Sequence, residues 1–149
     1  MTRSNSELKI NNRHQHTAWA LIAVLAAVLL TGCSSKPPQA PTDEGLRAAG
    51  VALDCYKALY ISQQPEVFLR GRAGTLTDED REQWVALLKH HLQMVQHQYG
   101  GVKAIEFSRA EPDTALNVMQ VFLKLTYADN QEEDIVVAMV QEADKWKMK

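Results

Sequence analysis

The sequence predicts an α+β domain in which two to three N-terminal helices pack on an antiparallel sheet of three to four strands. Two observations carry this prediction. Apolar residues between positions 43 and 99 recur at steps of three and four, which is the period of an amphipathic helix. After the pair Gly100-Gly101 the period becomes two, as in a half-buried strand. Helices followed by a run of strands favour a sheet that is covered by helices on one face.

The chain begins with a stretch that is typical of an export signal. Arg3, Lys9 and Arg13 precede an uncharged apolar run from Ala18 to Leu30. The run is shorter than the roughly 20 residues that cross a bilayer, and it fits the about 7–15 residues of a signal-peptide core. Residues 1–32 are therefore predicted to be a cleaved signal peptide.

The motif Leu30-Thr31-Gly32-Cys33 ends this run and resembles the lipobox of bacterial lipoproteins, in which small residues precede an obligatory cysteine. The resemblance implies that the chain is cut before Cys33 and that Cys33 carries a diacylglyceryl group. Two or more acyl chains anchor a protein lastingly, whereas one chain gives marginal binding. The expected location is the cell membrane, facing the periplasm or the outside. Ser34 in place of an aspartate favours the outer membrane in a Gram-negative host.

The part of the chain after the signal is expected to hold one domain. Residues 33–42 are rich in proline and serine and are predicted to be a flexible tether, and residues 43–149 to be the α+β domain. From position 33 onward, 17 acidic residues outweigh 13 basic ones, which argues against a nucleic-acid partner. Because Cys33 is taken up by lipid, no disulfide is expected, and Cys55 is interpreted as a small buried apolar residue.

Three helical segments are predicted before the double glycine. Thr42 is a candidate N-cap for the first, and residues 65–69 form a single turn. The stretch Thr77 to Asp80 resembles a capping box and opens the third helix, which runs to Tyr99. The residues expected to face the core are Leu46, Ala49, Leu53, Tyr56, Leu59 and Tyr60 in the first helix and Trp84, Leu87, Leu88, His91, Leu92, Val95 and Tyr99 in the third.

The strands are predicted after the double glycine. A first strand over residues 102–109 leads to a turn at Glu111-Pro112-Asp113, and a second runs over residues 116–127. A third covers residues 135–141, and Trp146 with Met148 closes the sheet, with the Trp146 ring expected on the apolar stripe of the helices. In the second strand Met119, Val121, Leu123, Leu125 and Tyr127 share one face, and Val118, Gln120, Phe122, Lys124 and Thr126 share the other.

The order of these elements resembles the nuclear-transport-factor-two-like lipoproteins, a cone-shaped α+β class of small domains of unknown function. The stretches that carry the resemblance are residues 100–105, 121–127 and 135–149. The resemblance implies that the sheet is curved and that sheet and helices form a cone. It implies little about activity, because the wider superfamily contains enzymes, ligand-binding proteins and protein-interaction modules.

No residue pattern predicts a metal site, and no cofactor is expected. His90 and His97 lie two turns apart on the third helix beside His91, and one helix with two ligands and no cysteine is a poor zinc site. The run Glu132-Glu133-Asp134 near Asp129 lacks the ligand spacing and central glycine of a calcium loop. These acids are interpreted as a charged hairpin tip.

The leading hypothesis is a membrane-anchored envelope lipoprotein whose domain is not an enzyme and binds an envelope protein or a small apolar ligand. In this hypothesis Cys33 is the lipid attachment site. The candidate residues for a cavity or a partner surface are Trp84, Phe122, Tyr127 and Trp146.

The alternative hypothesis is a small isomerase-like or hydrolase-like enzyme with an acid in the cavity of the cone. Asp54 is the acid nearest to the apolar stripe of the first helix, and Tyr56, Tyr60 and Tyr127 are candidate hydrogen-bond donors beside it. Asp54 also borders the polar face of that helix, where Lys57 can pair with it, so a solvated carboxylate is the expected state.

Overall fold

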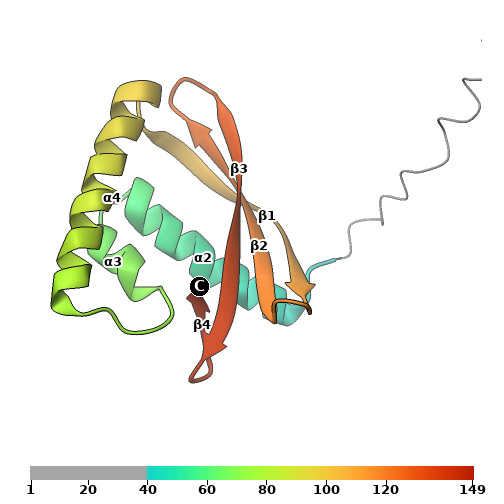
Figure 1. The fold of residues 1–149 in the computed structure, drawn as a ribbon. Coiled ribbons are helices and arrows are strands. Elements are labelled where there is room, and N and C mark those ends of the chain that lie inside the picture. The colour runs from blue at the N-terminus through green and yellow to red at the C-terminus, as the bar shows by residue number, and fades with distance from the viewer. Residues whose placement is uncertain (1–39) are drawn as a thin grey trace, which may run out of the picture. The chain divides into compact units, whose positions relative to one another are not determined.

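The computed structural model describes residues 40–149, and the predicted signal peptide, Cys33 and most of the tether lie outside them. Three helices precede four strands in the described part (Figure 1). None of these helices combines the length and the apolar character needed to cross a bilayer. The elements are α2 (Asp43–Tyr60), α3 (Pro65–Arg70), α4 (Asp78–Tyr99), β1 (Val102–Asp113), β2 (Val118–Tyr127), β3 (Glu132–Glu142) and β4 (Lys145–Met148).

The four strands form one antiparallel meander in the order β1-β2-β3-β4. Helix α2 crosses one face of this curved sheet, and α3 and α4 lie to one side of it (Figure 1). Register shifts in β1, between Val102 and Ala104 and between Phe107 and Arg109, are the irregularities that bend an edge strand. The α+β class, the helices before the strands and the curved antiparallel sheet confirm the predicted fold.

The core lies between α2 and the sheet. On β2 the predicted alternation is confirmed, because Val121, Leu123 and Leu125 are at most 1% exposed. Ala48 and Ala52 of α2 are fully buried in the same apolar cluster. Within residues 40–149 no polar or charged residue is buried, so this core is held by apolar contact.

The predicted core stripe of α2 is confirmed at Ala49 and Leu59, which are 4% and 2% exposed, and is wrong in part elsewhere. Leu46 is 48% exposed, and Leu53 is only partly buried against the core. Small residues face the sheet in their place, since a Cβ on Gly45 would lie 3.2 Å from Cβ of Ala110. Small side chains let the helix backbone approach the sheet closely, which turns the larger residues to the flank. The buried residues are Gly45, Ala48, Ala49, Ala52, Cys55 and Leu59.

The apolar face predicted for α4 is also wrong in part. Val95 is the helix's one buried residue, and Leu87 is 55% exposed. The reason is that α4 packs mainly on α3, with few contacts to β1, so it forms an outer layer beside the sheet (Figure 1). Both of its predicted ends are confirmed: the Thr77 hydroxyl accepts a hydrogen bond from the Asp80 amide at 3.1 Å, and Gly100 is left-handed with φ of 76°.

The first strand is longer than predicted. Glu111-Pro112-Asp113 is not a turn but the end of β1, paired with β2 as far as Val118, and the turn follows at residues 114–117. Proline is tolerated there because β1 is an edge strand, where a backbone amide can be lost without breaking an inner ladder.

Trp146 and Met148 belong to a separate strand, β4, which a tight turn at Ala143 and Asp144 joins to β3. Met148 is 4% exposed in the core, whereas Trp146 is only partly buried against it. The loop after α3 covers the outer edge of β4: the Met148 amide donates to Gly71 O at 2.8 Å, and the Ala73 amide donates to Met148 O at 2.7 Å.

Candidate functional site

Trp84 and Phe122 each lie under an arginine, at different places on the surface. The guanidinium of Arg72 lies 4.9 Å from the ring centroid of Trp84, which is 37% exposed on α4. The guanidinium of Arg109 lies 3.6 Å from the ring centroid of Phe122, on the sheet face that α2 leaves uncovered. Such contacts hold an arginine in place, and Arg109 also donates from Nε to a carboxylate oxygen of Glu111 at 3.0 Å.

Tyr127 lies at the end of β2 and is 6% exposed. Its ring stacks on that of Tyr99, with 4.4 Å between centroids, and its hydroxyl donates to a carboxylate oxygen of Glu133. Burial, followed by the hydrogen bond to Glu133, raises the pKa of the Tyr127 phenol, so the group is a neutral donor. Glu133 is therefore part of a tyrosine contact and not only of a charged hairpin tip.

Tyr60 connects α2 to α4. Its hydroxyl and Nε2 of His91 are 2.9 Å apart and share a hydrogen bond. Burial, with smaller contributions from Tyr56 and Glu133, raises the pKa of Tyr60 to about 12. The sequence analysis did not predict this pair. The two residues are 31 positions apart, and each alone looks like an ordinary residue of an amphipathic helix.

Asp54 and Cys55 are neighbours with opposite environments. Asp54 is exposed on α2, so its carboxylate does not lie in the core. Cys55 is 8% exposed, which confirms its interpretation as a buried apolar residue. Burial, and next the charge of Asp54, raise the pKa of the Cys55 thiol, which keeps it protonated and poorly nucleophilic.

Two of the hollows at the surface of the described residues lie beside candidate residues. One, of about 490 Å³, is lined by Trp146 together with Glu44, Pro112 and Val140. It lies where the beginning of α2 meets the turn between β1 and β2. The second, of about 220 Å³, lies between α3, the loop after it, the beginning of α4 and β4, and its charged lining residues are Glu66, Arg70, Arg72, Arg81, Glu142 and Lys147.

Comparison with known proteins supports the fold. No protein-family model matches the sequence, and no curated protein matches it. A similar solved structure is a crystal structure from Campylobacter jejuni, described as that of a candidate NTF2-like transpeptidase. The two chains share 14% sequence identity at a TM-score of 0.54, over 66% of this chain and 94% of the other. The fold is NTF2-like. At this identity the likeness establishes the fold alone.

The NTF2-like domain does not bring the four candidate residues into one site. Phe122 lies on the uncovered sheet face, and Tyr127 lies on the opposite face, towards α2. Trp146 lines the first hollow, and Trp84 lies under Arg72, which lines the second. The domain thus offers separate surface features.

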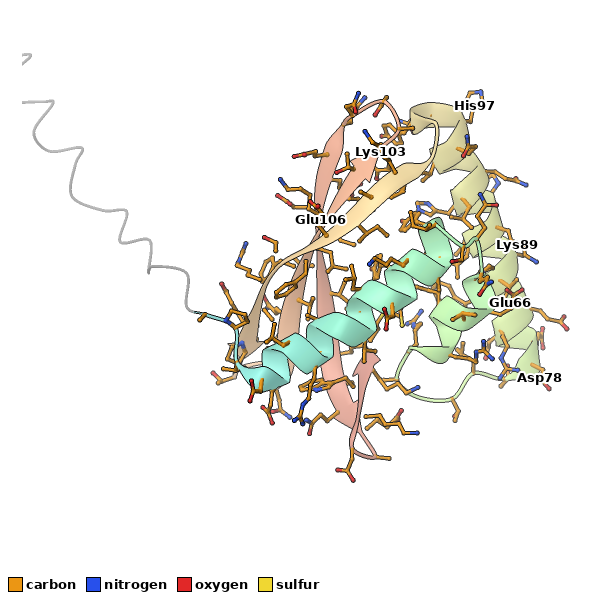
Figure 2. All side chains as sticks on the ribbon, turned by 180° about the vertical axis from the view of Figure 1, so that it is seen from behind. Glu66, Asp78, Lys89, His97, Lys103 and Glu106 are labelled. Atoms are coloured by element: carbon orange, nitrogen blue, oxygen red, sulfur yellow. The ribbon has the colours of Figure 1, made fainter. Side chains whose placement is uncertain are left out.

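The histidines of α4 are likewise dispersed. His90 and His97 are both exposed, and Figure 2 shows His97 pointing away from the domain near the end of α4. His91, expected to face the core, is exposed and shares a hydrogen bond with Tyr60.

Proposed function

We propose that the protein is a lipid-anchored protein of the cell envelope whose NTF2-like domain binds a partner and catalyses no reaction. The observation that favours binding over catalysis is the filled core between α2 and the sheet. Ala48, Ala52 and Met139 are each 0% exposed, and within residues 40–149 no polar or charged residue is buried. A proton-abstracting carboxylate needs a desolvated place in such a core, and none of the described acids has one.

The alternative enzyme, with Asp54 as its acid, has less support. Asp54 is exposed and lines neither of the two hollows described above. Tyr60 is directed to His91 on α4, and Tyr127 to Glu133 on β3. The proposed donors therefore have partners other than Asp54, which favours binding over acid–base catalysis.

A transpeptidase activity, as the name of the Campylobacter jejuni protein would suggest, also has less support. Acyl transfer through a cysteine needs an activated thiol, and the contacts of Cys55 bear on this form of the reaction alone. In the described part of the chain the one thiol is that of Cys55, which is 8% exposed and has a raised pKa. A buried, protonated thiol is a poor nucleophile.

The uncovered face of the sheet is the partner surface in this proposal. Val136 of β3 is 55% exposed and pairs in register with Phe122, whose ring lies under Arg109. Lys124 on the same face pairs with Glu132 at 3.0 Å, so the apolar centre has a charged border. An apolar centre with a polar rim is typical of protein interfaces.

The anchor is tested by metabolic labelling with an alkyne-bearing fatty acid in a bacterial host. The wild-type chain and Cys55→Ser should both carry the label, whereas Cys33→Ser should carry none and should accumulate as uncleaved precursor. The matched control is sharp because the chain has only two cysteines. Label retained on Cys33→Ser would overturn the anchoring proposal.

The partner surface is tested by photo-crosslinking in the intact envelope. A photoreactive residue at position 136 should give one adduct of defined mass, and the same residue at position 54, also exposed, should give none. Replacement of Phe122 by Asp should abolish the adduct at position 136. An equal yield at both positions, or an adduct that Phe122→Asp leaves unchanged, would contradict binding through this face.

A further inference from the structure

The hollow beside β4 gathers basic side chains from distant parts of the sequence. Arg70 ends α3, Arg72 follows in the loop, Arg81 lies in the first turns of α4 and Lys147 lies in β4. Four basic residues thus face two acidic ones, Glu66 and Glu142, although acidic residues outnumber basic ones in the whole chain by 18 to 16. The folding of the chain reverses the charge balance at this place.

The two carboxylates of the hollow already have partners. Glu142 accepts a hydrogen bond from the Gly74 amide at 3.2 Å. Glu66 pairs with Lys89, with 3.6 Å between the charged atoms, and Figure 2 shows these two side chains close together on α3 and α4. The acids therefore do not neutralise all the basic groups around them.

Three of the basic groups make contacts that favour their position at the hollow. Arg72 lies over the Trp84 ring, with 4.9 Å from its guanidinium carbon to the ring centroid, and this contact favours its position. Lys147 donates from Nζ to the backbone oxygen of Arg70 at 2.7 Å, so its ammonium group is fixed at the wall with two N–H bonds to spare. Arg81 pairs with Asp78 at 2.9 Å, and Asp78 itself is 93% exposed, outside the hollow. Fixed donors lose little entropy when they bind an anion.

We propose that this hollow binds a small oxyanion, the carboxylate or phosphate group of a ligand. Arginine presents a planar pair of N–H donors that matches both groups, and lysine adds a point charge. A volume of about 220 Å³ is enough for one such group with a short attached chain. The inference rests on the proposed binding function, for which it supplies a ligand class, and it does not depend on the anchor.

The experiment follows the amide NMR signals of the full chain in non-ionic detergent during titration with inorganic phosphate or with acetate at constant ionic strength. Signals of Gly74 and Thr75, which line the hollow, should shift along saturable curves, and those of β2 should not. Phosphate tests the tetrahedral group and acetate the planar one, so the two arms tell which form is preferred.

Two variants locate the binding. Arg72→Gln should weaken it by about tenfold or more, because a charge-assisted, bidentate contact is lost. Arg47→Gln removes an exposed arginine of α2 that lies outside the hollow and should leave the affinity unchanged. Non-saturable shifts with both anions, or equal weakening in both variants, would overturn the proposal. If the position-136 adduct persists in that case, the anion site fails while the proposed binding function stands.

Discussion

At the scale of single residues, position 71 requires glycine because a neighbouring side chain leaves no room for a Cβ atom. Its backbone angle imposes no such requirement. Its φ is an ordinary −76°, but a Cβ there would lie 2.2 Å from Sγ of Cys55 and 3.3 Å from Cε of Met148. The loop that covers the edge of β4 can therefore approach the core only where a side chain is missing. The contact joins α2, the loop and β4 at one point.

We expect Gly71→Ala to destabilise the domain by about 1–3 kcal/mol, the usual cost of overpacking a core. The loss should be smaller when Cys55→Ala is already present, because the atom that blocks the new methyl group is then absent. Chemical denaturation of the four proteins of this double-mutant cycle measures the coupling. Equal losses in both backgrounds would mean that the thiol is not the obstacle. Gly50→Ala is a suitable control, since its added Cβ would meet nothing within 4 Å.

At the scale of elements, the contact between Tyr60 and His91 ties the outer helix α4 to α2. The pKa of Tyr60 is raised from 10.0 to about 12, so the folded state holds the phenol proton more tightly than the unfolded state does. This contribution to stability is fully present below pH 10 and is lost as the pH rises from about 10 to 12.

We therefore expect the free energy of unfolding to fall between pH 10 and pH 12, and to fall less steeply in Tyr60→Phe. At neutral pH the same substitution should cost about 1 kcal/mol for the lost hydrogen bond. Urea denaturation at a series of pH values measures both effects. Parallel profiles for the wild type and Tyr60→Phe would show that another group dominates the alkaline loss.

Of the long elements, helix α4 has the fewest buried residues. It buries Val95 alone, and Trp84, Leu87 and Met94 are 37–55% exposed. Because local stability follows buried apolar contact, we expect its amides to exchange hydrogen faster than those of β2, by about tenfold or more. Native-state hydrogen exchange detected by mass spectrometry resolves the two segments. Equal protection of α4 and β2 would indicate that α4 unfolds only together with the core.

The elements also show how far sequence patterns reach. Caps and turn residues are local, so Thr42, Thr77 and Gly100 were found where the structure has them. Burial around a helix is decided by what lies opposite, which is why the stripe through Leu46 was misplaced. Pro112 was read as a turn because its role as part of an edge strand depends on the order of strands, which no local pattern contains.

Candidate sites are harder still, because they combine residues that lie far apart in the chain. Trp84 was singled out from its own helix, but its partner Arg72 comes from a loop. The basic hollow draws on Arg70 and Lys147, which lie 77 positions apart and meet only in the folded molecule. A sequence with more acidic than basic residues gave no signal for it.

At the scale of the whole molecule, the buried apolar cluster of residues 40–149 joins the first described helix to the last strand. It runs from Ala48 in α2 to Met148 in β4. We therefore expect a soluble chain of residues 34–149 to unfold in one cooperative transition, as small single domains do, with the midpoint of the lipid-anchored form. Circular dichroism during heating measures this. A chain that is unfolded without its anchor, or two separate transitions, would contradict it.

The pairing of Met148 with Gly71 and Ala73 also affects when the domain can fold during synthesis. The ribosome makes the loop long before it makes the strand that the loop covers. The loop and the Cys55 side of α2 can therefore form their native contacts only after residue 148 has been synthesised. Until then the emerging chain has an incomplete core and an uncovered β3, and the domain closes late. For a chain whose first 32 residues are predicted to direct export, late closure leaves time to pass through a membrane channel before the domain becomes too wide to be threaded.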